Sequence, residues 1–161
     1  MYVIIFIVKE VINMEIKMIM GDLKTPERLR YKVMFGDDIE DNFSSTYNHA
    51  YKQFRLLIFG AYQDNKLIGA IYLTPYTFDR LYIDQLFVDP EYQNNPELHV
   101  GSSLLKFVEN NMDDINDYYR TVFNYLLICP ADKHVENIYI NNGYTLVNTE
   151  QGLMSKKVNK L

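Results

Sequence analysis

The chain has 161 residues, 48% of them hydrophobic, which fits one globular domain with a sizeable single core. A net charge of −5 without a basic cluster argues against nucleic-acid binding. No stretch offers the roughly 20 apolar residues of a membrane-spanning helix, and the single cysteine excludes an internal disulfide framework and fits a reducing, cytoplasmic compartment.

An apolar run, Tyr2–Val8, opens the chain but lacks the basic start and small-residue cleavage site of a signal peptide. Residues 1–14 are therefore either an added strand or an N-terminal extension before the folded domain, residues 15–161. The first core strand is predicted over Glu15–Met20, with alternate residues from Ile16 to Met20 on the buried face.

Two helices are predicted next. The first begins with Thr25 as N-cap and Pro26 in the first helical position, where the missing N–H costs nothing, and Gly36 ends it. Its inward-facing residues are expected to be Leu29, Val33 and Met34. The second helix is capped by Asp37 or Asp38. It carries an apolar stripe that we interpret as core: Ile39, Phe43, Tyr47, Tyr51 and Phe54.

A β-hairpin follows the helices. Its strands are predicted over Leu56–Tyr62 and Leu67–Leu73, with a tight polar turn between them. Gly69 inside the second strand predicts a bulge or a close backbone approach. Pro75 is expected to end the hairpin, and the next strand, Ile83–Val88, makes a meander.

A polar loop, Glu91–His99, separates that strand from a helix that begins at Val100-Gly101-Ser102-Ser103. The buried face of this helix is expected to carry Val100, Leu104, Phe107, Val108 and Met112. The first turn of a helix has unpaired N–H groups and a partial positive charge, and small side chains let an anion approach them. The segment is therefore suited to a phosphorylated cofactor.

The C-terminal part is predicted to return to the sheet. Asn110–Arg120 indicates a polar, acidic connection, and Val122–Cys129 indicates a buried strand, parallel to Ile83–Val88, in which Cys129 is packed rather than nucleophilic. The remaining elements are expected to be a helix over Ala131–Asn142 ended by Gly143 and a hairpin of Tyr144–Thr149 and Leu153–Val158.

Two segments carry a resemblance to a known family. Val88–Gln93 (V-D-P-E-Y-Q) with Gly101–Leu105 (G-S-S-L-L) resembles the acetyl-CoA loop of the GNAT superfamily of N-acetyltransferases, V-x-P-x-x-[RQ]-x-x-G-x-[GA]. Asn137–Tyr144 (N-I-Y-I-N-N-G-Y) resembles that family's last helix, which ends Y-x-x-x-G-[FY]. The resemblance implies a single α/β (α+β) domain with a mixed, mostly antiparallel sheet flanked by helices. It also implies direct acetyl transfer from acetyl-CoA, as co-substrate, to a primary amine.

The loop departs from the family pattern. Gln93 and Gly101 are eight positions apart where the pattern has five, and His99 stands in place of the first glycine. Glycine serves there because it tolerates φ > 0 and lets backbone approach phosphate. The insertion within Asn94–His99 is expected to weaken the pyrophosphate cradle.

The resemblance also implies roles for single residues. The expected cofactor-binding residues are Leu86, Phe87, Val88, Gln93, Asn94, His99, Val100, Gly101, Ser102, Ser103 and Asp132. Tyr139 is the expected acid for the leaving thiolate, the alternative being that it only packs. Asp84 is the candidate base, acting through water, a role that needs burial. Asp132 either bonds the pantetheine chain or favours its helix N-terminus. His49, His99 and His134 lack metal-ligand spacing, so no metal is expected.

The acceptor is expected to be a small-molecule or peptide amine. The acidic net charge mildly favours a cationic amine, while amino acid, polyamine, peptide terminus and antibiotic stay open. We expect neither a nucleic acid nor a membrane as a partner, and a homodimer stays open. The rival interpretation is a CoA-binding or interaction module of the same fold that has lost catalysis.

Overall fold

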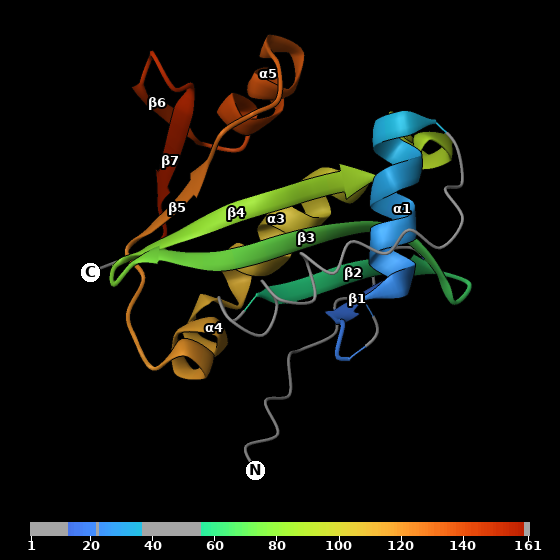
Figure 1. The fold of residues 1–161 in the computed structure, drawn as a ribbon, viewed down its shortest axis with the longest axis horizontal. Coiled ribbons are helices and arrows are strands. Elements are labelled where there is room, and N and C mark those ends of the chain that lie inside the picture. Colours follow the sequence, from blue (N-terminus) through green and yellow to red (C-terminus); the bar gives the residue numbers. More distant parts are fainter. Residues whose placement is uncertain (1–12, 22, 37–55, 160–161) are drawn as a thin grey trace.

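The structure is a computed structural model and describes residues 13–21, 23–36 and 56–159. These residues form one seven-stranded sheet in the order β1-β2-β3-β4-β5-β7-β6, flanked by helices (Figure 1). Neighbouring strands run antiparallel except β4 and β5, which are parallel. The predicted mixed, mostly antiparallel α/β class is confirmed. The N-terminal apolar run and the second predicted helix lie outside the described residues.

The elements follow the predicted order. The strands are β1 (Met14–Met18), β2 (Leu57–Gln63), β3 (Lys66–Thr77), β4 (Arg80–Val88), β5 (Tyr125–Ile128), β6 (Thr145–Asn148) and β7 (Leu153–Lys157). The helices are α1 (Lys24–Phe35), α3 (Val100–Asn110), α4 (Met112–Tyr119) and α5 (Lys133–Asn141), with a single 3₁₀ turn, η1 (Pro90–Tyr92), after β4.

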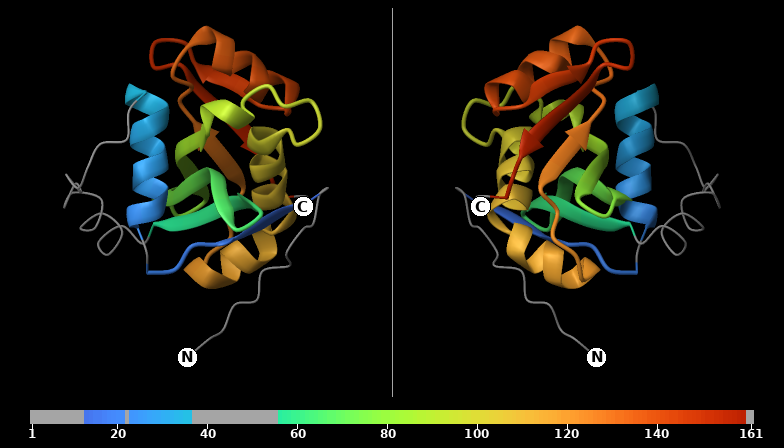
Figure 2. Two further views of the ribbon diagram at one scale, coloured as in Figure 1. Left: turned by 90° about the vertical axis from the view of Figure 1, so that its right-hand side faces the viewer. Right: turned by 90° about the vertical axis from the view of Figure 1, so that its left-hand side faces the viewer.

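Helices α1 and α3 cover opposite faces of the sheet (Figure 2). The larger core lies on the α3 side, where Leu104, Phe107 and Val108 are buried as their helical spacing predicts. The smaller core lies under α1 and includes Leu29 and Tyr72. Each strand of the meander therefore buries side chains on both faces.

A buried polar group holds α1 on β3. The Glu27 carboxylate is 1% exposed, accepts a hydrogen bond from Tyr72 Oη at 2.9 Å and pairs with Arg30 Nη2 at 2.9 Å. A buried carboxylate is costly unless it is paired and hydrogen-bonded, and here both conditions are met. The contact fixes the helix that carries Val33 toward the end of β4.

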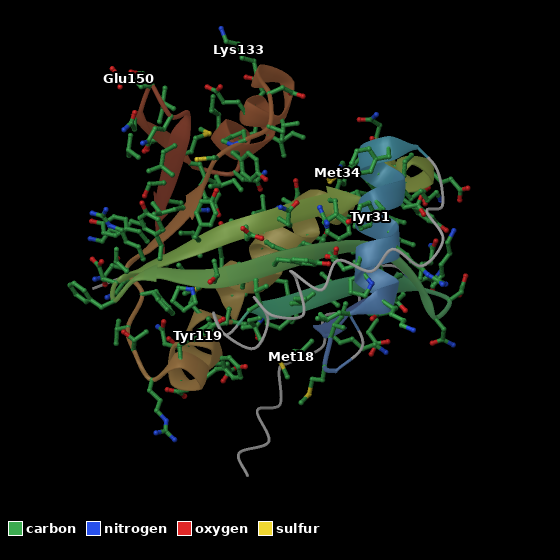
Figure 3. All side chains as sticks on the ribbon, viewed as in Figure 1. Met18, Tyr31, Met34, Tyr119, Lys133 and Glu150 are labelled. Carbon is green, nitrogen blue, oxygen red and sulfur yellow. The ribbon has the colours of Figure 1, made fainter. Side chains whose placement is uncertain are left out.

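Strand β5 pairs with β4 over a short distance only. The parallel register runs from Arg80 opposite Tyr125 to Tyr82 opposite Leu127. Beyond Tyr82, β5 rises away from β4 and leads into α5, β6 and β7 (Figure 1). We call β5, α5, β6 and β7 the C-terminal arm; Lys133 and Glu150 lie at its far end (Figure 3).

Two irregularities shape the central strands. Tyr72 pairs with Gln85 but Leu73 pairs with Ile83, so Asp84 is the extra residue of a β-bulge in β4. Against β2, Gly69 pairs with Ala61 but Leu67 pairs with Tyr62, so Ile68 is the extra residue of a second bulge. A Cβ added at Gly69 would lie 3.0 Å from the Phe87 carbonyl. The close backbone approach predicted at Gly69 is therefore confirmed, and the predicted bulge lies one residue earlier.

Some predicted boundaries are wrong. Helix α1 begins at Lys24 with Leu23 as its N-cap, so Thr25 is not the cap and Pro26 lies inside the first turn, where it needs no N–H. Met34 is 56% exposed, and Met20 is 74% exposed because β1 ends at Met18.

Further along the chain, Pro75 does not end the hairpin, because β3 continues to Thr77 through a register shift that tolerates the missing donor. The expected polar connection contains α4, in which Met112, Ile115 and Tyr119 are buried at helical spacing. Cys129 is exposed, not buried, because β5 ends at Ile128.

Candidate active site

A pocket of about 440 Å³ lies where the end of β4, the loop that follows it, the first turn of α3 and the inner side of α5 meet. Its lining residues are Val33, Leu86, Phe87, Val88, Tyr92, Gln93, Asn94, Asn95, His99, Val100, Gly101, Ser102, Val135, Ile138 and Tyr139. Segments far apart in the chain thus share one cavity, at the place where β4 and β5 have parted.

Most of the predicted site residues meet in this pocket. Every predicted cofactor residue except Ser103 and Asp132 lines it, and so does Tyr139. Ser103 turns back to the loop, because its Oγ donates to the Leu98 carbonyl at 3.2 Å. Asp132 is exposed and acts as the N-cap of α5, accepting from Val135 N at 2.9 Å. The structure therefore agrees with the helix-terminus reading of Asp132.

Five lining residues were missed: Val33, Tyr92, Asn95, Val135 and Ile138. Val135 precedes Ile138 by three residues and Tyr139 by four, so helical spacing on α5 offered a signal for both missed residues. Val33 comes from α1, which meets the pocket only through the packing of α1 on the sheet, and no local pattern reveals that contact.

The loop after β4 is tied down at its start. The Asp89 carboxylate is 1% exposed, lies 3.1 Å from Lys32 Nζ of α1 and accepts from Glu91 N at 3.0 Å. Gln93 Nε2 donates to the Val88 carbonyl at 2.8 Å. The loop therefore leaves the sheet in a defined direction, with Gln93 folded back onto the end of β4.

The inserted part of the loop is also ordered by its own contacts. Asn95 Oδ1 accepts from the N–H groups of Glu97 and Leu98 at 3.0 and 3.2 Å. Leu98 is only 4% exposed and belongs to the larger core. His99 has φ 44° and ψ 54°, the left-handed conformation that glycine adopts most readily. The insertion is thus anchored in the core and brings His99 to the pocket.

The first turn of α3 offers a place for an anion. Val100, Gly101 and Ser102 line the pocket, and a Cβ built on Gly101 meets only Val88 Cγ2, at 3.8 Å. The positive end of the helix dipole and the first-turn N–H groups therefore lie beside open space. A phosphate group fits the chemistry of this wall.

Tyr139 of α5 also lines the pocket and is 3% exposed. Its ring packs edge-on against Tyr144, with centroids 5.6 Å apart. Burial raises the pKa of Tyr139 well above its ordinary value near 10, and Tyr82 adds a smaller effect. The hydroxyl therefore holds its proton firmly at neutral pH, as a proton donor must.

Asp84 lies outside the pocket lining, half-buried at the bulge of β4. Its neighbour Tyr82 has a pKa raised to about 12, first by burial, then by Cys129 and more weakly by Asp84. Tyr82, at the place where β4 and β5 part, is therefore close enough to interact with both Cys129 and Asp84.

Two further properties concern the described residues only. Among them, no group of His, Cys, Asp and Glu side chains is arranged to hold a metal ion. None of their helices has the length and apolar character needed to span a membrane.

Known proteins share this fold. Solved structures that resemble the chain include a GNAT family acetyltransferase from Elizabethkingia anophelis with acetyl-CoA bound, at 17% identity and a TM-score of 0.64, covering 91% of this chain and 99% of that one. The ribosomal-protein-S18-alanine N-acetyltransferase from Escherichia coli has 14% identity and a TM-score of 0.64, covering 92% and 96%. An aminoglycoside 6'-N-acetyltransferase complexed with coenzyme A has 12% identity and a TM-score of 0.65, covering 91% and 98%.

At these identities the likeness to solved structures concerns the fold. No curated protein sequence matches the chain. The sequence profile of the acetyltransferase (GNAT) family matches residues 24–126, more than half of the 161 residues. The chain belongs to the acetyltransferase (GNAT) family.

Proposed function

We propose that the protein is an acetyl-CoA-dependent N-acetyltransferase that moves an acetyl group directly to a primary amine. The observation that carries this proposal is the pocket that the first turn of α3, the end of β4 and Tyr139 of α5 line together. The first-turn amides of α3 suit phosphate groups, and Tyr139 carries a hydroxyl that is protonated at neutral pH. The structural neighbour from Elizabethkingia anophelis, which has acetyl-CoA bound, supports the choice of co-substrate.

The residues present fit the co-substrate. Val100, Gly101 and Ser102 are assigned to the pyrophosphate through their first-turn amides, with Gln93, Asn94 and His99 beside them. Leu86, Phe87 and Val88 lie where β4 no longer pairs with β5. Their backbone is therefore assigned to the amide groups of the pantetheine chain. Ser103 supports this wall through the loop, and Asp132 through the start of α5.

The chemistry divides between two side chains. Acetyl-CoA supplies an activated acetyl thioester. Tyr139, which is protonated at neutral pH, donates its proton to the thiolate that leaves. Asp84 takes the proton of the acceptor amine through water. The half-burial of Asp84 at the bulge supports this assignment.

The acceptor is a small-molecule or peptide amine. Structural neighbours include enzymes named for a protein alanine and for an aminoglycoside, so the fold accommodates both classes. The net charge of −5 favours a cationic amine. We place the protein in the cytoplasm, in agreement with its single free cysteine.

Binding is tested first, because it needs no acceptor. Acetyl-CoA at millimolar concentration is expected to raise the melting temperature, since a ligand that binds only the folded state stabilises it. Gly101→Glu is expected to abolish the rise by placing a carboxylate beside the phosphates. A panel of amines then identifies the acceptor by release of free CoA. No thermal shift in the unmodified protein would contradict the proposal.

A second candidate is a CoA-binding module of the same fold without catalysis. The observation that favours it is the lengthened loop, which puts His99 into the left-handed conformation where the family pattern has glycine. This candidate predicts a thermal shift with acetyl-CoA but no CoA release with any amine. The amine panel therefore separates the two functions.

A further inference from the structure

One residue, Asn142, joins the end of α5 to two other elements. It is the C-cap of α5, and its side-chain Nδ2 donates to the Ile138 carbonyl at 2.7 Å and to Ser102 Oγ of α3 at 3.4 Å. Its own carbonyl accepts from Lys156 Nζ of β7 at 2.7 Å. The orphan carbonyl at the helix end thereby gains a charged donor.

Lys156 extends this contact to α3. Its Nζ lies 2.9 Å from Glu109 Oε1, and the two side chains are 27% and 18% exposed. The stem passes Gly143 so closely that an added Cβ there would lie 3.3 Å from Lys156 Cε. Lys156 therefore has little freedom and links Asn142 to Glu109 through one ammonium group.

The two contacts on α3 lie on the same side of that helix. Ser102 and Glu109 are seven residues apart, which is two helical turns. Asn142 is held near the first turn of α3 by Ser102 and, through Lys156, near its end by Glu109. We call these four residues the α5 clamp.

The clamp acts close to Tyr139. Asn142 follows Tyr139 by three residues, and Tyr144 N donates to the Tyr139 carbonyl at 3.0 Å. Burial, followed by the Glu109 carboxylate, raises the pKa of Tyr144, so the ring that packs on Tyr139 stays neutral. The pairing of β4 with β5 does not hold Tyr139 in place over the end of β4, because that pairing ends at Tyr82.

We infer that Lys156 is a positioning residue that sets where Tyr139 lies over the end of β4, by holding Asn142 and Glu109 together. The inference rests on the proposed function, since Tyr139 is the proton donor only in that reaction. It assigns to an ion pair between two residues outside the pocket lining the placement of Tyr139, which lines the pocket.

The clamp itself is tested without any ligand. Lys156→Met removes the ammonium and keeps most of the stem, Lys156→Arg keeps a cationic donor, and Lys157→Met removes a neighbouring charge as the matched control. Hydrogen exchange is expected to accelerate at least about tenfold at the amides of Asn142, Gly143 and Tyr144 in Lys156→Met. The other two variants should exchange there as the unmodified protein does. Unchanged exchange in Lys156→Met overturns the inference.

Kinetics then distinguish a positioning role of Lys156 from a purely structural one. Lys156→Met is expected to lower kcat by about 10- to 100-fold, since a misplacement near 1 Å costs up to about 100-fold. The Kd for acetyl-CoA should change less than about threefold, and Lys156→Arg should restore most of kcat. In a Tyr139→Phe background, adding Lys156→Met should lower kcat by less than a further factor of about two, because the effects of coupled residues are not additive. An equal loss in both backgrounds overturns the positioning role.

Failure of the proposed function and failure of the inference about Lys156 give different results. If the unmodified protein neither binds acetyl-CoA nor releases CoA with any amine, the proposed function fails, and with it the role of Lys156 in catalysis. If the unmodified protein is active and Lys156→Met keeps its kcat, the proposed function stands and the inference is overturned. Melting temperatures of all variants show whether a loss of kcat reflects unfolding.

Discussion

The hydroxyl of Tyr139 is one oxygen on a ring that is otherwise fully packed against Tyr144 and the larger core. Tyr139→Phe keeps that packing and removes the proton. We expect kcat to fall by roughly 10²–10⁴-fold, the range for a positioned acid, with the affinity for acetyl-CoA little changed. Steady-state kinetics with the acceptor from the amine panel, together with calorimetric binding of acetyl-CoA, measure both quantities. A variant that retains near-full kcat would exclude Tyr139 as the acid.

His99 carries a backbone cost that substitution can reveal. Its φ of 44° is unfavourable for any residue with a Cβ, by about 1–2 kcal/mol. We expect His99→Gly to be more stable than His99→Ala by about 1 kcal/mol, even though glycine gains freedom in the unfolded chain. Urea denaturation of the two variants measures this difference, and both lack the imidazole. Equal free energies of unfolding would show that the backbone relaxes at no cost.

At the scale of elements, the contact of β3 with α3 leaves no room at Gly69. An added Cβ would lie 2.8 Å from Val100 Cγ1 and 3.0 Å from the Phe87 carbonyl. Gly69→Ala is therefore expected to cost about 1–3 kcal/mol and to weaken acetyl-CoA binding by displacing the first turn of α3. Thermal denaturation and calorimetric titration measure the two effects. Val100→Ala removes one of the two clashes. Gly69→Ala should therefore lower the free energy of unfolding by less in a Val100→Ala background than in the unmodified protein.

The inserted loop is anchored by Leu98, not merely added to the surface. Leu98→Ala is expected to lower the free energy of unfolding by about 2–5 kcal/mol, because a buried leucine leaves a cavity. Glu97→Ala, next to it and exposed, is the control and should change stability by less than about 0.5 kcal/mol. Equilibrium denaturation measures both. A Leu98 variant as stable as the control would mean that the loop folds independently of the core.

The elements that sequence predicted are those in which a local pattern agrees with the packing. The strand Ile83–Val88 is an apolar run and the helix after it has apolar residues at helical spacing; both formed, although Met112, expected on that helix, belongs to α4. The same approach missed α4, whose Met112, Ile115 and Tyr119 keep helical spacing among four acidic or amide side chains. Cys129 shows the opposite limit, since apolar neighbours suggested burial while the strand ended one residue earlier.

For the site, sequence indicated the residues of the loop and of α5 because a family pattern joins them. It did not indicate Val33, nor that Ser103 faces the loop, because both depend on how elements pack. It also treated Lys156 as an ordinary strand residue. The partner of Lys156 on α3 lies 47 positions away along the chain and is reached only through the folded arm.

At the scale of the whole molecule, buried tyrosines make the free energy of unfolding depend on pH in the alkaline range. The pKa values of Tyr139 and Tyr144 are raised above their ordinary value near 10, chiefly by burial. Below pH 10 both the folded and the unfolded chain hold these protons, so the stabilisation is complete. Above it the unfolded chain releases them first, and the free energy of unfolding falls as pH rises.

We expect each of the two residues to contribute about 1 kcal/mol to that fall between pH 10 and 11. Tyr144→Phe removes one contribution and should flatten the dependence, whatever its effect on stability at neutral pH. Denaturant titrations at several pH values, compared between this variant and the unmodified protein, measure the slopes. Identical slopes would show that Tyr144 ionises alike in both states.

The exposed Cys129 makes the molecule easy to label. The chain contains one cysteine, and it lies just past β5 on the arm that carries α5, near Tyr82. A maleimide fluorophore therefore attaches at a single known position without any engineering of the sequence. Because the chain has no tryptophan, the emission of such a dye is well separated from the intrinsic fluorescence of the protein. Titration with acetyl-CoA would then report directly on the place where β4 and β5 part.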